Sequence, residues 1–118
     1  MLLVDYCRVD RTIARRLLER HGHTVETVGT VLGALDSWRA RNYDLLVLDW
    51  ELPDMRACEM VQVIRGGRAG DASKPILGLV SATDRETSGR CDDLGLDACV
   101  AKPLDPPALY RALADLFA

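Results

Sequence analysis

Short stretches typical of strands alternate along this chain with longer stretches in which apolar residues recur every three or four positions. The short stretches are Met1–Val4, Thr24–Val28, Leu45–Leu48, Pro75–Val80 and Ala98–Ala101. Four of them are continuous apolar runs, which are typical of strands buried on both faces of a sheet. Thr24–Val28 alternates between polar and apolar residues, which is more typical of an edge strand.

The longer stretches predict five amphipathic helices. Their apolar positions are, in chain order, Ile13, Leu17 and Leu18; Val31, Ala34, Leu35 and Trp38; Ala57, Met60, Val61 and Ile64; Cys91 and Leu94; and Leu109, Leu113, Leu116 and Phe117. Thr30 and Asp105 are suited to N-caps, and Thr83 with Glu86 has the spacing of a capping box. The fourth helix, Asp84–Leu94, is unusually polar, so we expect it to be held loosely or to be completed by a partner.

Strand and helix alternate five times in 118 residues, which predicts an α/β fold with a parallel sheet and helices on both of its faces. At this length, and with 48% hydrophobic residues, we expect one domain that spans residues 1–118. The chain begins directly on an apolar strand, which suggests a piece of a longer protein.

The formal charge of −3 offers no basic surface for direct binding to nucleic acid. No apolar run approaches the length that spans a bilayer, so we expect a cytoplasmic domain without membrane contact. The four cysteines form no CxxC pair and lie far from both histidines in sequence, which disfavours a zinc site. We interpret them as reduced thiols that pack as small apolar side chains.

Polar side chains follow four of the predicted strands directly. Asp5 ends the first strand and Asp49 the third, while Ser81 and Lys102 follow the fourth and the fifth. Because the functional crevice of a doubly wound sheet lies at the carboxyl ends of its strands, we expect these four side chains to gather at one edge. Two neighbouring carboxylates repel each other unless a cation intervenes, and oxygen ligands suit a hard divalent cation.

With these residues the chain resembles the receiver domains of two-component response regulators, and the resemblance covers essentially its whole length. It rests on Asp5, on the motif DWELPDM with Asp49 and Pro53, and on Lys102 followed by Pro103. The resemblance implies a flavodoxin-like, doubly wound (βα)5 fold with strand order 2-1-3-4-5. The segments GDASKPILGL and GLDACVAKPL look most like receivers attached to hybrid sensor histidine kinases.

The resemblance also implies a chemistry. Asp49 would take a phosphoryl group from the phosphohistidine of a histidine kinase or histidine phosphotransfer domain, in two-component or phosphorelay signalling. Asp5, Asp49 and the backbone carbonyl of Glu51 would hold Mg²⁺, Lys102 would pair with the transferred group, and Ser81 would supply a hydroxyl. Such a domain catalyses at most its own phosphorylation and is not a turnover enzyme.

Four places depart from the family pattern. One is the Asp-Gly that the family has after the turn, which reads Arg56 and Ala57 here. Tyr6 stands where the family has a second acidic residue after the first strand. Counting back from Lys102 puts Val80 in the place of the hydroxyl residue that ends strand four, with Ser81 one position late. Cys99 occupies the position of the aromatic switch residue, so we expect a weak conformational response or one routed through Ser81.

The substitution at Tyr6 affects the expected affinity for Mg²⁺. We expect Mg²⁺ to bind weakly, with the Tyr6 ring covering part of the crevice and Lys102 paired directly with Asp49. If Mg²⁺ binds tightly nonetheless, Glu51 or Asp10 must supply the missing carboxylate.

Two alternative functions remain open. A pseudo-receiver, locked by its substitutions, would act as a protein-interaction module independent of phosphorylation. A small nucleotide-binding enzyme of flavodoxin-like fold is disfavoured, because no glycine-rich phosphate loop follows the first strand.

Overall fold

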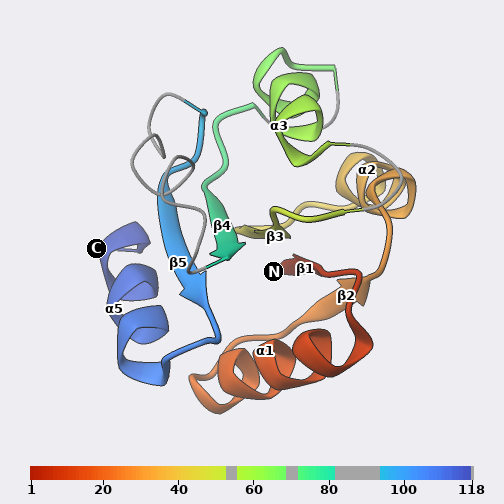
Figure 1. Cartoon of the computed structure of the whole chain (residues 1–118). Helices are drawn as coiled ribbons and strands as arrows, with labels where there is room; N and C mark the ends of the chain where they lie inside the picture. The colour runs from red at the N-terminus through yellow and green to blue at the C-terminus, as the bar shows by residue number, and fades with distance from the viewer. Residues whose placement is uncertain (53–55, 69–71, 82–93, 118) are drawn as a thin grey trace.

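The computed structural model describes residues 1–52, 56–68, 72–81 and 94–117. They form a five-stranded parallel sheet whose strands lie in the order β2-β1-β3-β4-β5 (Figure 1). The strands are β1 (Leu2–Val4), β2 (Glu26–Val28), β3 (Leu46–Asp49), β4 (Ile76–Ser81) and β5 (Ala98–Lys102). This order confirms the flavodoxin-like arrangement, and it places β2 at an edge of the sheet.

The helices within the described residues follow strands β1, β2, β3 and β5. They are α1 (Arg8–Arg20), α2 (Val31–Ala40), α3 (Ala57–Arg65) and α5 (Pro106–Leu116). The Thr30 hydroxyl accepts a hydrogen bond from the Gly33 N–H at 3.2 Å, and the Asp105 carboxylate accepts one from the Ala108 N–H at 3.3 Å, so both residues are N-caps. The expected helix at 84–93, with its capping box and Cys91, lies outside the described residues. Within the described ranges no helix has the length and apolar character needed to cross a membrane.

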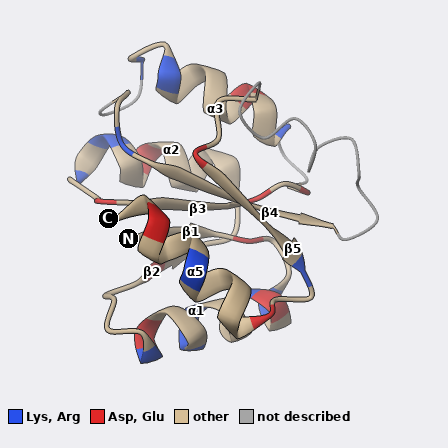
Figure 2. Ribbon diagram, turned by 90° about the vertical axis from the view of Figure 1, so that its left-hand side faces the viewer, with Lys and Arg blue, Asp and Glu red and all other residues tan. Residues whose placement is uncertain are grey.

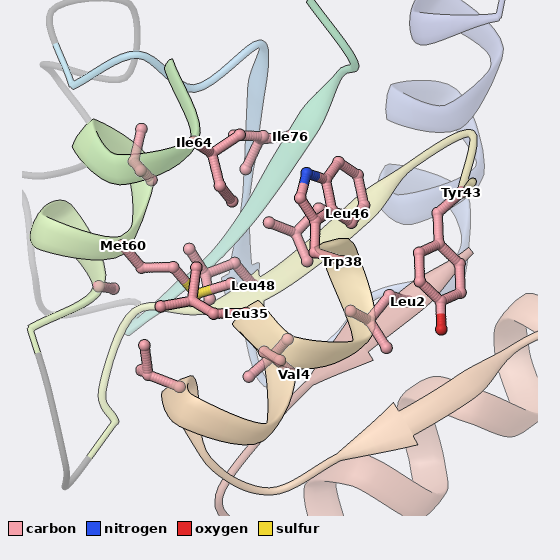
Figure 3. Packing of buried hydrophobic residues seen from close by; sticks show 14 of the residues in the cluster. Leu2, Val4, Leu35, Trp38, Tyr43, Leu46, Leu48, Met60, Ile64 and Ile76 are labelled. Atoms are coloured by element: carbon pink, nitrogen blue, oxygen red, sulfur yellow. The ribbon is translucent and has the colours of Figure 1, made fainter. Parts of the chain in front are cut away.

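Each face of the sheet carries its own hydrophobic cluster, because successive side chains of a strand point to opposite sides. On one face, shown in Figure 3, side chains of β1 and β3 pack against α2 and α3, among them Leu2, Val4, Leu35, Trp38, Leu46, Leu48, Met60 and Ile64. On the other face the strands pack against α1 and α5, through Leu3, Ala14, Leu18, Val47, Leu77, Leu79, Val100, Leu109 and Leu113. Charged residues lie mainly on the helices and connections around this apolar sheet (Figure 2).

Two predicted core positions are wrong. Ile13 is 47% exposed, and the buried stripe of α1 consists of Ala14 and Leu18 instead. A small alanine permits the helix to approach the sheet closely, whereas Ile13 lies about 100° further round the helix. Phe117 is 44% exposed because it follows the last turn of α5, where its ring lies 5.8 Å from that of His23.

Candidate functional site

The side chains predicted to meet do lie on one face, at the carboxyl ends of the strands. Asp5, Asp49, Ser81 and Lys102 each stand two residues after a member of the cluster that packs against α1 and α5; those members are Leu3, Val47, Leu79 and Val100. Since strand side chains repeat every second residue, the same alternation brings all four side chains to the α1 and α5 side. The register of β4 and β5 places Ser81 directly beside Lys102.

Lys102 is the centre of the site. Its ammonium donates hydrogen bonds to Asp5 Oδ2 at 2.9 Å and to Asp10 Oδ2 at 3.2 Å. It also forms an ion pair with Asp49 Oδ1 at 3.4 Å. The expected pairing of Lys102 with Asp49 is therefore present, but two other carboxylates lie closer to the ammonium.

Backbone groups hold the two buried carboxylates in place. The side chain of Asp5 is fully buried, and its Oδ1 accepts a hydrogen bond from the Cys7 N–H at 3.0 Å. Asp49 is also buried, and its Oδ1 accepts a hydrogen bond from the Glu51 N–H at 3.2 Å. The Arg11 guanidinium donates to the backbone carbonyl of Asp5 at 3.0 Å, which ties α1 to the end of β1. The phosphoacceptor candidate is thus fixed on a rigid support.

A cavity of about 220 Å³ opens above these groups. It is lined by Tyr6, Cys7, Asp10, Asp49, Glu51, Ser81 and Lys102. Tyr6 borders the cavity, and 62% of the residue is exposed. Asp49 is therefore largely buried, but it lines a cavity that a ligand can enter.

Burial raises the pKa of Asp49 to about 6, and the negative charge of Asp5 and a hydrogen bond with it act in the same direction. The Glu51 N–H and the charge of Lys102 oppose this rise without cancelling it. Burial lowers the pKa of Lys102, but its hydrogen bond with Asp5 and the charges of Asp49 and Asp5 outweigh burial and raise that pKa above its ordinary value. Lys102 therefore stays protonated, while Asp49 titrates close to neutral pH.

Sequence reasoning gave Asp10 only a conditional role and misplaced the end of β4. Asp10 lies in the first turn of α1, and its distance from the strand ends could not be judged before that helix was positioned. Counting back from Lys102 assigned the strand-end position to Val80, which is buried in the structure, whereas Ser81 ends the strand and lines the cavity. Ser81 was already expected at this edge of the sheet, and strand alternation supports that position independently of the length of the intervening segment.

Over residues 1–114 the chain matches the protein family described as response regulator receiver domain. The chain belongs to this family. It is 32% identical to the sensory/regulatory protein RpfC of Xanthomonas campestris pv. campestris, over 98% of this chain but only 16% of that protein. The receiver domain thus spans a small part of the curated relative that it matches.

Solved receiver structures have the same fold. The chemotaxis protein CheY4 of Vibrio cholerae superposes with a TM-score of 0.85 at 26% identity, covering 98% of this chain and 95% of that one. The receiver domain of the sensor histidine kinase PA1611 of Pseudomonas aeruginosa superposes with a TM-score of 0.83 at 26% identity, covering 98% and 93%. The latter structure has a magnesium ion coordinated in the active-site cleft.

The donor chemistry of this receiver domain suits the same kind of ion. Asp49 lines the cavity, and the fully buried Asp5 shares the Lys102 ammonium with it. Both supply hard carboxylate oxygens, which is the ligand type that Mg²⁺ prefers. In the described part of the chain, no group of three or more Asp, Glu, His or Cys side chains is arranged to hold a metal ion. The ligand set of Asp5, Asp49 and Glu51 stays a prediction.

Proposed function

We propose that this receiver domain accepts a phosphoryl group on Asp49 from the phosphohistidine of a histidine kinase or histidine phosphotransfer domain. The observation that carries the proposal is the placement of Asp49, a carboxylate at an accessible cavity with the Lys102 ammonium 3.4 Å away. This arrangement combines a nucleophilic oxygen with a cation that can pair with incoming negative charge.

In the proposed reaction an oxygen of Asp49 attacks phosphorus in line with the bond to the histidine nitrogen. A P–O bond forms, the P–N bond breaks, and its electron pair stays on the departing imidazole. The chain contributes mainly position and charge, because phosphoryl transfer needs little other chemistry from a protein. The Glu51 N–H orients the nucleophile, and Lys102 is close enough to neutralise the transferred oxygens.

Mg²⁺ would be held in this domain by Asp5, Asp49 and the backbone carbonyl of Glu51. When bound, the ion would neutralise charge on the phosphoryl oxygens. We expect its affinity to be low, because the phenol at Tyr6 replaces a charged oxygen ligand.

The surface beside the cavity suits a partner protein. Val9 and Ile13 lie one turn apart on α1 and are 66% and 47% exposed, next to the cavity-lining Asp10. Exposed apolar side chains beside a polar opening are typical of interaction sites. We propose that the partner's phosphohistidine reaches Asp49 across this part of α1, in the cytoplasm, with the kinase either separate or covalently linked.

The test is incubation with acetyl phosphate and Mg²⁺ followed by intact mass spectrometry. We expect one added phosphoryl group on the natural domain and none on Asp49→Asn. A second candidate function, the phosphorylation-independent interaction module, is favoured by Tyr6 and Cys99, which depart from the family's metal and switch positions. The absence of an added phosphoryl group on the natural domain, both with acetyl phosphate and with a phosphorylated histidine kinase, would support that candidate.

A further inference from the structure

A third carboxylate reaches the Lys102 ammonium from an element that the family motif does not include. Asp10, in the first turn of α1, lies 3.2 Å from Lys102 Nζ, slightly closer than Asp49 at 3.4 Å. The position after Asp5, where the family has its second acidic residue, holds the neutral Tyr6. The site therefore contains three carboxylates around one ammonium, although one of them comes from a helix.

These three carboxylates differ in mobility. Asp5 is fully buried and held by the Cys7 N–H, so it is a fixed anchor for the ammonium. Asp49 is nearly as buried, whereas the Asp10 side chain is 45% exposed. Lysine carries three N–H donors on a flexible stem. With Asp5 fixed, the remaining carboxylates at the ammonium are Asp10 from α1 and Asp49 from β3, and its position depends on the balance between these two contacts.

We propose that Asp10 is a positioning residue that holds the Lys102 ammonium on the α1 side of the cavity, away from Asp49. The carboxylate of Asp10 thereby supplies a negative charge to the site, whereas the neutral Tyr6 supplies none. Its benefit for phosphoryl transfer rests on the function proposed above: an Asp49 carboxylate that is less tightly paired with Lys102 stays open to attack phosphorus. Once the phosphoryl group arrives, its oxygens draw Lys102 away from the weaker, solvent-exposed partner.

Lysine side-chain NMR tests this arrangement directly, because the chain contains only two lysines, Lys74 and Lys102. The natural domain labelled with ¹³C,¹⁵N-lysine would be compared with Asp10→Asn, Asp10→Glu and Glu19→Gln. Glu19 is a matched control, because it is a half-exposed carboxylate on the same helix, paired with Arg15 instead of Lys102. Lys74 serves as the internal reference.

In Asp10→Asn we expect the ammonium protons of Lys102 to exchange with water about fivefold faster, which corresponds to the loss of one contact of about 1 kcal/mol. We also expect stronger nuclear Overhauser effects between the Lys102 ε-methylene and the Asp49 β-methylene, as the ammonium moves toward Asp49. Asp10→Glu should resemble the natural domain, and Glu19→Gln should leave Lys102 unchanged.

The proposal is overturned if Lys102 is unaffected in Asp10→Asn, if Glu19→Gln changes it equally, or if its contact with Asp49 does not strengthen. If the contact between Lys102 and Asp49 does not strengthen, Asp10 binds Lys102 without determining the position of its ammonium. No phosphodonor is present in this experiment. The result for Lys102 in Asp10→Asn is therefore independent of phosphorylation. The positioning role of Asp10 can hold in a domain that accepts no phosphoryl group, and it can fail in a domain that accepts one.

Discussion

The buried carboxylate of Asp49 costs stability when it is ionised. Burial beside Asp5 makes its ionised form unfavourable, which is why its pKa rises to about 6. A neutral side chain at this position would avoid that cost.

Asp49→Asn should therefore stabilise the domain in a pH-dependent manner. The pKa of Asp49 is raised from 3.8 to about 6 on folding, so the folded state holds a proton more tightly than the unfolded state. Stability from this group is present below about pH 4 and is lost as the pH rises through about 6. Asparagine avoids the loss, so we expect a gain on the order of 1–3 kcal/mol at about pH 8 that disappears near pH 4. Urea unfolding at both pH values measures it, and a gain of equal size at both would contradict this account.

Tyr6→Asp should strengthen Mg²⁺ binding. The substitution restores a charged oxygen ligand beside Asp5, and a charge-assisted contact of about 1–3 kcal/mol corresponds to roughly tenfold to hundredfold in affinity. Trp50 adjoins Asp49 and its fluorescence provides the titration signal.

Tyr6→Asn is the matched control for this titration, because it removes the ring without adding charge. If Tyr6→Asp binds Mg²⁺ no more tightly than the natural domain, another carboxylate already fills the missing ligand position. Our assignment of the ligands would then be wrong.

At the scale of elements, strand β4 shows how closely the sheet and its neighbours are packed. Gly78 faces the segment before β5, and a Cβ atom at this position would lie 2.8 Å from Leu96 Cδ1. Leu96 is only 3% exposed, so its side chain has little room to move away. Glycine weakens a strand interior, but here its lack of a side chain permits the close approach.

Gly78→Ala should consequently destabilise the domain by about 1–2 kcal/mol, since overpacking of a buried site outweighs the entropy gained from replacing glycine. Chemical denaturation measures the loss. In the Leu96→Val background the clashing Cδ1 atom is absent, and the further cost of Gly78→Ala should fall markedly. Additive effects of the two substitutions would argue against the steric cause.

Helix α1 has a second role beside covering the sheet. Its buried residues, Ala14 and Leu18, fix the helix against the strands, and this placement carries Asp10 to the rim of the cavity. Arg11, the next residue, donates to the carbonyl of Asp5 and links the same turn to β1. Helix α1 thus both covers the sheet and supplies a carboxylate to the site.

At the scale of the whole molecule, the site exists only when the fold is complete. Lys102 and Asp5 are 97 residues apart in sequence, and Lys102 and Asp10 are 92 apart. Their contact requires the first and last strands to join the same sheet on either side of β3 and β4. The chemistry of this receiver domain is therefore tied to its global stability and not to any local motif.

Periodicity and boundary signals in the sequence determined the α/β class, the edge position of β2, and the N-caps at Thr30 and Asp105. These features depend on nearest neighbours along the chain, so a linear pattern is sufficient to reveal them. The sequence also predicted which side chains meet at one edge of the sheet, because the carboxyl ends of parallel strands lie at the same edge. These side chains are Asp5, Asp49, Ser81 and Lys102.

Only the tertiary structure decided which partners Lys102 holds, that Ala14 replaces Ile13 in the core, and that β4 ends at Ser81 instead of Val80. Each of these outcomes depends on distances of a few ångströms between elements remote in sequence. Hydrophobic periodicity fixes which face of an element is buried to within one or two positions, but the contact distances come from how the elements pack together.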